Sequence, residues 1–443
     1  IVGSNSECGL GYAYFYLMTI PNKVEWTGAM SNDWADDANW SAGCAPLPES
    51  NVVIPADGPY PVLSASKTSR TNSSSSSNTC KNVYFAPGAM LENQHLLEYD
   101  TAFVDMRLTA TTWHSMSAPL QGMYSGDMYI PHKKGDFDAG SLESTDVFAV
   151  SSFQGSRNSW APYAFWLSVY NKRVPTYHEN GALSYQESET AAFVPTNGMD
   201  QQLKPGMGYQ LLGYGPTNGA EELIVRLPKP DTHYSYYDSL GNETSRRVNV
   251  AHSPKLAFTP NANGLMSITL TNDEPSDKFM FGNPAMANIN MAKFLEDNGL
   301  SSTYYRMDNS VWNAENIYTM SSATGGVLPP MRSVLVQLKN GTKATSCTVN
   351  LSVEHLQVPT TSTRNGGASQ IAPRRTPSID NETPQIMTIY ALNDWGQARC
   401  VLAANSNAYD TYEHDEDALF ISSGVEQGVA EDVATSPINI YTV

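Results

Sequence analysis

The segment that most constrains this fold runs from Phe279 to Leu295. It opens with three apolar residues, passes through Gly-Asn-Pro at 282–284, and ends with Met286, Ile289 and Phe294 at helical spacing. Glycine and proline interrupt regular structure, so the chain must turn sharply after the apolar run. We therefore predict a core strand, a tight turn and one short helix in this segment.

Short apolar runs bounded by Gly, Pro and Asn recur along the rest of the chain. Tyrosine and tryptophan are frequent, with 24 and 8 copies, and such residues favour strands on a pleated surface. The 443 residues exceed what one ordinary core holds, which favours two to four domains. We predict an all-β chain of several modules.

We divide the chain into five parts. Residues 1–24 read as a strand that belongs to a preceding module. Residues 25–104 predict a small tryptophan-rich module, built as a parallel strand coil or as a sandwich. Residues 105–357 predict a large jelly-roll-like β-sandwich, and residues 358–380 a linker or exposed loop. Residues 381–443 predict a C-terminal β-sandwich module, whole or partial.

Charge and hydropathy exclude some classes of partner. The formal net charge is −18, a field that repels nucleic acid and anionic lipid. No run of 18 apolar residues occurs, so we expect no direct insertion into a membrane. The chain begins at Ile1 without a signal peptide, and we expect it to be a mature or excised piece of a longer protein.

Several motifs resemble segments of very large secreted and cell-surface proteins of the Bacteroidota. Residues 279–295 are similar to their FGNP(F/Y)MA.IDL..F segment, and residues 26–63 resemble a W-T-G…D-W…N-W…Y-P-V pattern that opens their modules. Leu203-Lys204-Pro205-Gly206-Met207-Gly208-Tyr209 matches their L-x-P-G-x-G-Y turn. The resemblance implies an adhesin-like, non-enzymatic structural protein associated with type IX secretion, either exposed on the outer membrane or secreted. The implied partners are other modules of the same long chain, further copies in a homo-oligomer, or other surface proteins.

The resemblance also suggests sites of modification. Asp100-Thr101-Ala102 and Asp238-Ser239-Leu240 are similar to the short O-glycosylation motif of exported proteins in this group. Thr101 and Ser239 are therefore candidate acceptors.

Two aromatic groups could bind a glycan. Rings beside carboxylates and amides are a common construction of sugar sites, and Asp33, Asp36 and Asp37 accompany the first group. The alternative for both groups is a place in the hydrophobic core. The candidate glycan-binding residues are Trp34 and Trp40 in the first group, and Trp160, Tyr163, Trp166 and Tyr170 in the second.

One acidic run is a candidate calcium site. Calcium takes six to eight oxygen ligands, and Asp410, Glu413, Asp415 and Asp417 supply carboxylates close together in sequence. The spacing is not that of an EF-hand, and a solvated loop or a structural hydrogen-bond cluster is the alternative. Apart from calcium we expect no cofactor.

Five cysteines leave at least one thiol unpaired within the chain. Cys44 and Cys80 flank the same predicted module, and we predict a disulfide between them. No nucleophile elbow or phosphate-binding loop occurs, so we expect no enzymatic activity. The alternatives are a glycan-binding accessory protein of a polysaccharide-capture system, and a secreted glycosidase or peptidase.

Overall fold

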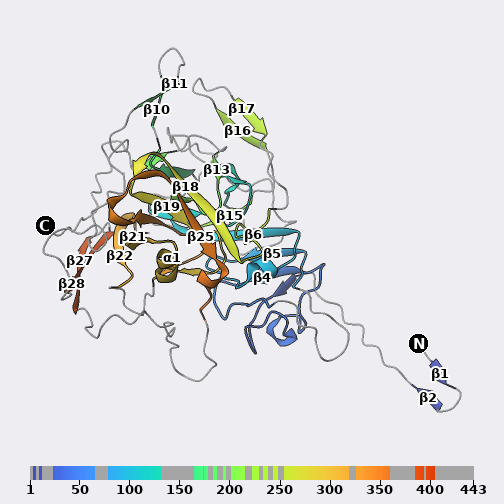
Figure 1. The fold of residues 1–443 in the computed structure, drawn as a ribbon. Helices are drawn as coiled ribbons and strands as arrows, with labels where there is room; N and C mark the ends of the chain where they lie inside the picture. Colours follow the sequence, from blue (N-terminus) through green and yellow to red (C-terminus); the bar gives the residue numbers. More distant parts are fainter. Residues whose placement is uncertain are drawn as a thin grey trace.

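The structure is a computed structural model (Figure 1). Strands dominate the described residues, which confirms the all-β prediction at the level of a β-rich fold. No helix among those residues is long and apolar enough to span a bilayer. The described ranges are 3–5, 9–11, 23–64, 78–130, 164–172, 174–177, 183–186, 193–195, 201–214, 222–228, 233–237, 243–247, 254–318, 326–359, 385–393 and 396–404.

The tryptophan-rich region forms a parallel coil of strands. Strands β3, β4, β5 and β6 pair in parallel one after another, and β15 closes the sheet by pairing antiparallel with β6. Val24, Val52, Val83 and Ala102 stack in register and are fully buried. The predicted boundary at residue 104 falls inside β6. The bounds are β3 Lys23–Glu25, β4 Asn51–Ile54, β5 Asn82–Phe85, β6 Thr101–Thr109 and β15 Glu222–Leu227.

Two four-stranded antiparallel sheets follow. One has the strand order β12-β9-β14-β7, and the other has the order β19-β24-β21-β22. The bounds in the first are β12 Phe193–Pro195, β9 Ala164–Tyr170, β14 Gly208–Tyr214 and β7 Trp113–Ser117. The bounds in the second are β19 Lys278–Gly282, β24 Ser333–Leu338, β21 Leu300–Asp308 and β22 Val311–Asn316.

These two sheets pack against each other through a second, smaller hydrophobic cluster. Trp113 and Tyr170 of the first sheet contact a cluster that includes Met280 and Trp312 of the second. The sheets approach closely at Gly208, where a Cβ atom would lie 2.5 Å from Met280 Cγ. Only glycine fits there without displacing its neighbours.

Residues 279–295 form the predicted strand, turn and helix. Strand β19 ends at Gly282, the short strand β20 (Asn288–Asn290) follows the turn, and α1 spans Met291–Asp297. The fully buried Asn283 holds the turn, because its side chain accepts from Ala285 N and donates to the carbonyls of Ala287 and Leu328 at 2.8–2.9 Å.

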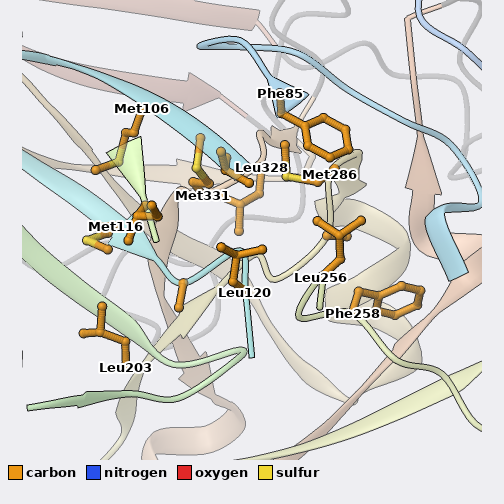
Figure 2. Packing of buried hydrophobic residues seen from close by; sticks show 14 of the residues in the cluster. Phe85, Met106, Met116, Leu120, Leu203, Leu256, Phe258, Met286, Leu328 and Met331 are labelled. Carbon is orange, nitrogen blue, oxygen red and sulfur yellow. The ribbon is translucent and has the colours of Figure 1, made fainter. Parts of the chain in front are cut away.

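The same turn attaches the sheets to the coil. Leu91 N donates to Met286 O at 2.6 Å, and Met286 N donates to the side chain of Gln94. Figure 2 shows Met286 beside Phe85 of the coil, within one continuous hydrophobic core. That core holds residues from Val24 to Leu351, so the coil and the sheets share a single apolar interior.

A two-stranded ribbon crosses the body of the molecule. Strand β18 (Leu265–Ser276) pairs antiparallel with β25 (Ala344–Ser352), and Figure 1 draws them side by side in yellow and orange. Ile268, Leu270, Val349 and Leu351 face the core, while the alternate residues face outward. The ribbon therefore covers the core with one face only.

The remaining elements are short strands and 3₁₀ helices. Strands β27 and β28 lie within the range predicted for the C-terminal module, and the two pair antiparallel. The other strands are β1 Gly3–Asn5, β2 Gly9–Gly11, β8 Met123–Tyr124, β10 Val174–Tyr177, β11 Leu183–Gln186, β13 Gln202–Leu203, β16 His233–Tyr237, β17 Glu243–Arg247, β23 Val327–Leu328, β26 Leu356–Gln357, β27 Gln385–Asn393 and β28 Gly396–Ala404. The 3₁₀ helices are η1 Asp37–Asn39, η2 Gln94–Leu96, η3 Ser125–Asp127, η5 Lys339–Gly341 and η6 Val353–His355.

Candidate functional site

One face of the sheet β12-β9-β14-β7 carries half-buried aromatic rings. Cross-strand pairing places Trp113 and Trp166 on either side of Leu212, and directly opposed residues share a face. Tyr214 lies two residues further along β14, and its ring centroid is 5.9 Å from that of Trp166 at an interplanar angle of 61°. The three rings are half-buried, and Trp113 also packs against the cluster between the two sheets, so this is the face that is turned toward the second sheet.

A row of buried polar side chains lies next to these rings. Ser115 and Ser168 stand opposite Gln210, again on the same face of the sheet. Gln210 is 1% exposed, and neither its Nε2 nor the Oγ of Ser117 has a hydrogen-bond partner among the described residues. Gln210 lies on the same face as Gly208, which approaches Met280 and Ser333 of the second sheet, so its amide is enclosed between the two sheets.

An arginine and a histidine lie at the edge strand of this sheet. Arg332 Nη1 lies 3.3 Å from His114 Nδ1. His114 Nε2 lies within hydrogen-bond distance of both backbone groups of Thr109, 3.0 Å from its N and 3.1 Å from its O. Burial lowers the pKa of His114 to about 4, and the charge of Arg332 acts in the same direction. Near neutral pH the imidazole is therefore uncharged.

A second buried charge pair is structural. Asp105 on β6 and Arg226 on β15 form a bidentate bond, with Nε–Oδ1 at 2.7 Å and Nη2–Oδ2 at 3.0 Å. Burial raises the pKa of Asp105, and the bond to Arg226 opposes that rise. The pair joins neighbouring strands of the coil sheet and touches no half-exposed aromatic ring of the site. We assign it to the fold.

The first aromatic group does not form a glycan-binding surface in the structure. Trp34 is 1% exposed and Trp40 is 3% exposed, with ring centroids 4.7 Å apart in an edge-to-face contact. Trp40 Nε1 also donates to Trp34 O at 2.8 Å. These rings fill the coil core and present no stacking face, so the prediction of a glycan platform at Trp34 and Trp40 is corrected.

The second aromatic group is described in part. Trp166 and Tyr170 lie on the same face of β9, four residues apart, with Ser168 between them. Trp166 joins the aromatic surface above, whereas Tyr170 packs against the cluster between the two sheets. Trp160 and Tyr163 lie outside the described residues.

Two further predictions are corrected by burial and covalent state. Cys44 and Cys80 both carry free thiols, so the predicted disulfide is wrong. Cys80 is buried, and burial raises its pKa to about 12. Thr101 is 9% exposed at the start of β6, where it offers little surface for a glycan, and is not retained as an acceptor. Ser239 lies outside the described residues.

The calcium ligands predicted in the acidic run also lie outside the described residues; they are Asp410, Glu413, Asp415 and Asp417. Over the part of the chain that the structure describes, no three His, Cys, Asp or Glu side chains gather as a metal site would need. The calcium site stays a prediction.

Sequence reasoning missed Trp113, Tyr214 and Gln210. Gln210 stands alone as a polar residue in the apolar run of β14, which is a visible signal of an unusual environment. Trp113 and Tyr214 join Trp166 only through strand pairing between residues about 50 or 100 positions apart, and no local pattern encodes that pairing.

We compared the chain with protein-family models, with curated proteins and with solved structures, and none of the three comparisons found a match.

Proposed function

We propose that this chain is a non-enzymatic structural or adhesive segment of a large extracellular surface protein. The observation that carries the proposal is the single core shared by the coil and the sheets, joined at the turn around Met286. Two regions with one apolar interior move and unfold as a unit, which suits a segment that transmits force along a chain of modules. The motifs shared with Bacteroidota surface proteins support the same assignment, with export by type IX secretion.

The proposal includes a finer description of the fold. We assign the two facing sheets, β12-β9-β14-β7 and β19-β24-β21-β22, to a jelly-roll-like sandwich. Their contact through Met280, Trp312 and Trp113 supports this assignment. The coil would be a small preceding module, and β27 with β28 would begin a C-terminal module.

The mass and the accessibility of the native polypeptide test the proposed function. The measurement is the mass of the native polypeptide that carries this sequence, before and after treatment of intact cells with an external protease. We expect a mass several times the 48.3 kDa of this chain, and its loss on protease treatment. A cytoplasmic protein of the same cells serves as the control and must stay intact. A polypeptide near 48.3 kDa that survives treatment contradicts the proposal.

A second candidate function is glycan binding at the aromatic face of β9 and β14. The half-buried rings of Trp166 and Tyr214 favour it.

Substitution at one ring tests glycan binding. Trp166→Ala removes a stacking surface, and we expect at least a tenfold loss of affinity for any polysaccharide that the unaltered chain retards in affinity gels. Tyr318→Ala is the matched control, because Tyr318 is an aromatic residue that is 58% exposed elsewhere on the molecule. Equal losses in both variants, or no retardation by any polysaccharide, count against this candidate.

A further inference from the structure

The ribbon of β18 and β25 has an outer face of small polar side chains. Ser267, Thr269 and Thr271 on β18 stand opposite Asn350, Thr348 and Ser346 on β25, and all six are exposed. The hydroxyl oxygens of Thr269 and Thr348 are 3.3 Å apart. The inner face carries the buried Ile268 and Leu270, so one side of the ribbon is covered and the other is open.

The direction of the backbone groups follows from two hydrogen bonds to one side chain. Asn350 N and Asn350 O both bond to the side chain of Asn298, at 2.7 and 3.1 Å, and so point away from β18. In an antiparallel pair, residues whose backbone groups point away from each other alternate with residues that bond across the ladder. The backbone N–H and C=O groups of Ser267, Thr269 and Thr271 therefore point outward, at the free edge of β18.

Both ends of this edge are closed by asparagines. Asn261 N donates to Leu265 O at 2.8 Å at one end. At the other end, Asn171 O accepts from Asp273 N at 2.9 Å, and the Asn171 side chain donates to Glu274 O. Between these two caps, the outward groups of residues 267, 269 and 271 have no hydrogen-bond partner in the part of the chain that the structure describes. The edge offers a window of six backbone groups.

We propose that this window docks β18 of a second copy of the chain, in an antiparallel pair centred on Thr269. The ribbon of each copy would then form half of a four-stranded sheet. An open strand edge with regular outward groups is a template for a further strand, and strand addition is an established mode of protein recognition. The inference does not depend on the proposed surface function.

The charges around the window favour a second copy as its occupant. Residues 265–272 carry no charged side chain, so the window offers nothing to a basic or an acidic peptide strand. The first carboxylate after the window in the sequence is Asp273, and Lys172 Nζ binds it at 2.8 Å. A neutral edge on a chain of net charge −18 is the place where two copies approach with the least repulsion.

The sequence of the window is also complementary to itself. Antiparallel pairing about Thr269 places Thr269 opposite the same residue of the second copy, and Ser267 opposite Thr271. Cross-strand hydroxyl pairs of this kind stabilise a sheet, and no like charges face each other. Repulsion between the remaining charges weakens as salt shortens the screening length to about 8 Å at physiological ionic strength. Added salt should therefore strengthen the dimer.

The test is the oligomeric state of the full chain by sedimentation velocity, over a range of protein and salt concentrations. We expect a monomer–dimer equilibrium that shifts toward the dimer as salt rises. Thr269→Lys places two ammonium groups face to face at the two-fold axis and should weaken the dimer at least tenfold. Thr348→Lys is the matched control, because it adds the same charge to the same exposed face one strand further from the axis.

Each result decides the question. Dimerisation that Thr269→Lys weakens and Thr348→Lys largely preserves supports the proposal. A monomer under all conditions overturns it, as does a dimer that neither variant weakens, or that both weaken equally. Urea unfolding of both variants checks that the fold is kept, since the two side chains are exposed and make no contact with the core.

Discussion

The two edge strands β3 and β18 show how one chain closes one sheet edge and leaves another open. At β3, Glu25 N donates to Ser41 Oγ and Ser41 N donates to Glu25 O, each at 2.9 Å. Trp40 lies opposite Trp26 in the same contact. At β18, no such segment among the described residues meets residues 267, 269 and 271. Both edge strands present backbone N–H and C=O groups that can bond to a neighbouring segment. The edges differ because a later segment of the chain runs back along β3.

The closing segment is stable because its side chains belong to the core. Trp40 carries the segment against β3 and packs its ring between those of Trp26 and Trp34, at centroid distances of 5.0 and 4.7 Å. Because the rings that hold this segment are buried, closing the β3 edge adds no exposed apolar surface. Ser267, Thr269 and Thr271 on the outer face of β18 carry hydroxyl groups, which water satisfies without a cover.

Removal of Trp40 should have the largest effect on this comparison. Trp40→Ala leaves a cavity in the coil core and should cost about 3–5 kcal/mol of the free energy of unfolding. The β3 edge would also lose its cover, and we expect aggregation at lower protein concentration. Urea unfolding and light scattering measure the two effects. Met30→Ala is the control, because Met30 is 71% exposed and its loss should change stability by less than about 0.5 kcal/mol.

The turn at Asn283 tests whether the coil and the sheets behave as one unit. Asn283→Ala removes three buried hydrogen bonds and should cost about 3 kcal/mol, at roughly 1 kcal/mol for each bond. Because this turn joins the two regions, we expect their unfolding transitions to separate when tryptophan fluorescence is compared with far-UV circular dichroism. The exposed Asn263→Ala should leave one transition at the original midpoint. A single, unshifted transition in Asn283→Ala contradicts a shared core.

Acid should destabilise the sheet region through His114. Its pKa is about 4 in the folded protein against 6.5 for the free side chain, so the unfolded chain binds the proton more readily. Its contribution to stability is present above pH 6.5 and is lost as pH falls toward 4, to a total of about 3 kcal/mol. Unfolding curves across this range measure the slope. In His114→Gln that part of the slope should vanish, and an unchanged slope would show that other groups cause it.

The smallest expected effect is at the edge of β3 itself. Ser41→Ala removes the hydroxyl that accepts from Glu25 N and should cost about 1 kcal/mol. The same deletion on the open edge, Thr269→Ala, removes no bond to the backbone and should cost less. A difference in urea midpoint between the two variants would sharpen the comparison. Equal midpoints would mean that the Ser41 hydroxyl does not hold the closure.

The sequence predicted local elements better than it predicted exposure. The apolar run before Gly282 and the turn before Gly208 were predicted correctly as strand boundaries, because glycine, proline and asparagine act within a few residues. The closure of β3 was not foreseen, since Ser41 and Glu25 are 16 positions apart and carry no shared pattern. The edge of β18 was equally invisible, because alternation in a strand indicates its faces and not its neighbours.

The site predictions failed where they depended on tertiary packing. Trp34 and Trp40 have the same local composition whether they line a core or a sugar platform, and only packing separates the two. Cys44 and Cys80 were paired on their place in one module, which does not fix the geometry that a disulfide needs. Trp166 was grouped with residues close to it in sequence, whereas the ring that the structure places beside it is Tyr214 on another strand.

Hydrogen–deuterium exchange at the two edges tests the account most directly. At low protein concentration, the amides of Ser267, Thr269 and Thr271 should exchange at rates close to those of an unfolded chain, while the amide of Glu25 is protected. At high protein and salt concentration, the three β18 amides should become protected and Glu25 should not change. Protection of the β18 amides that is independent of concentration would contradict the open edge, and rapid exchange of Glu25 would contradict the closed one.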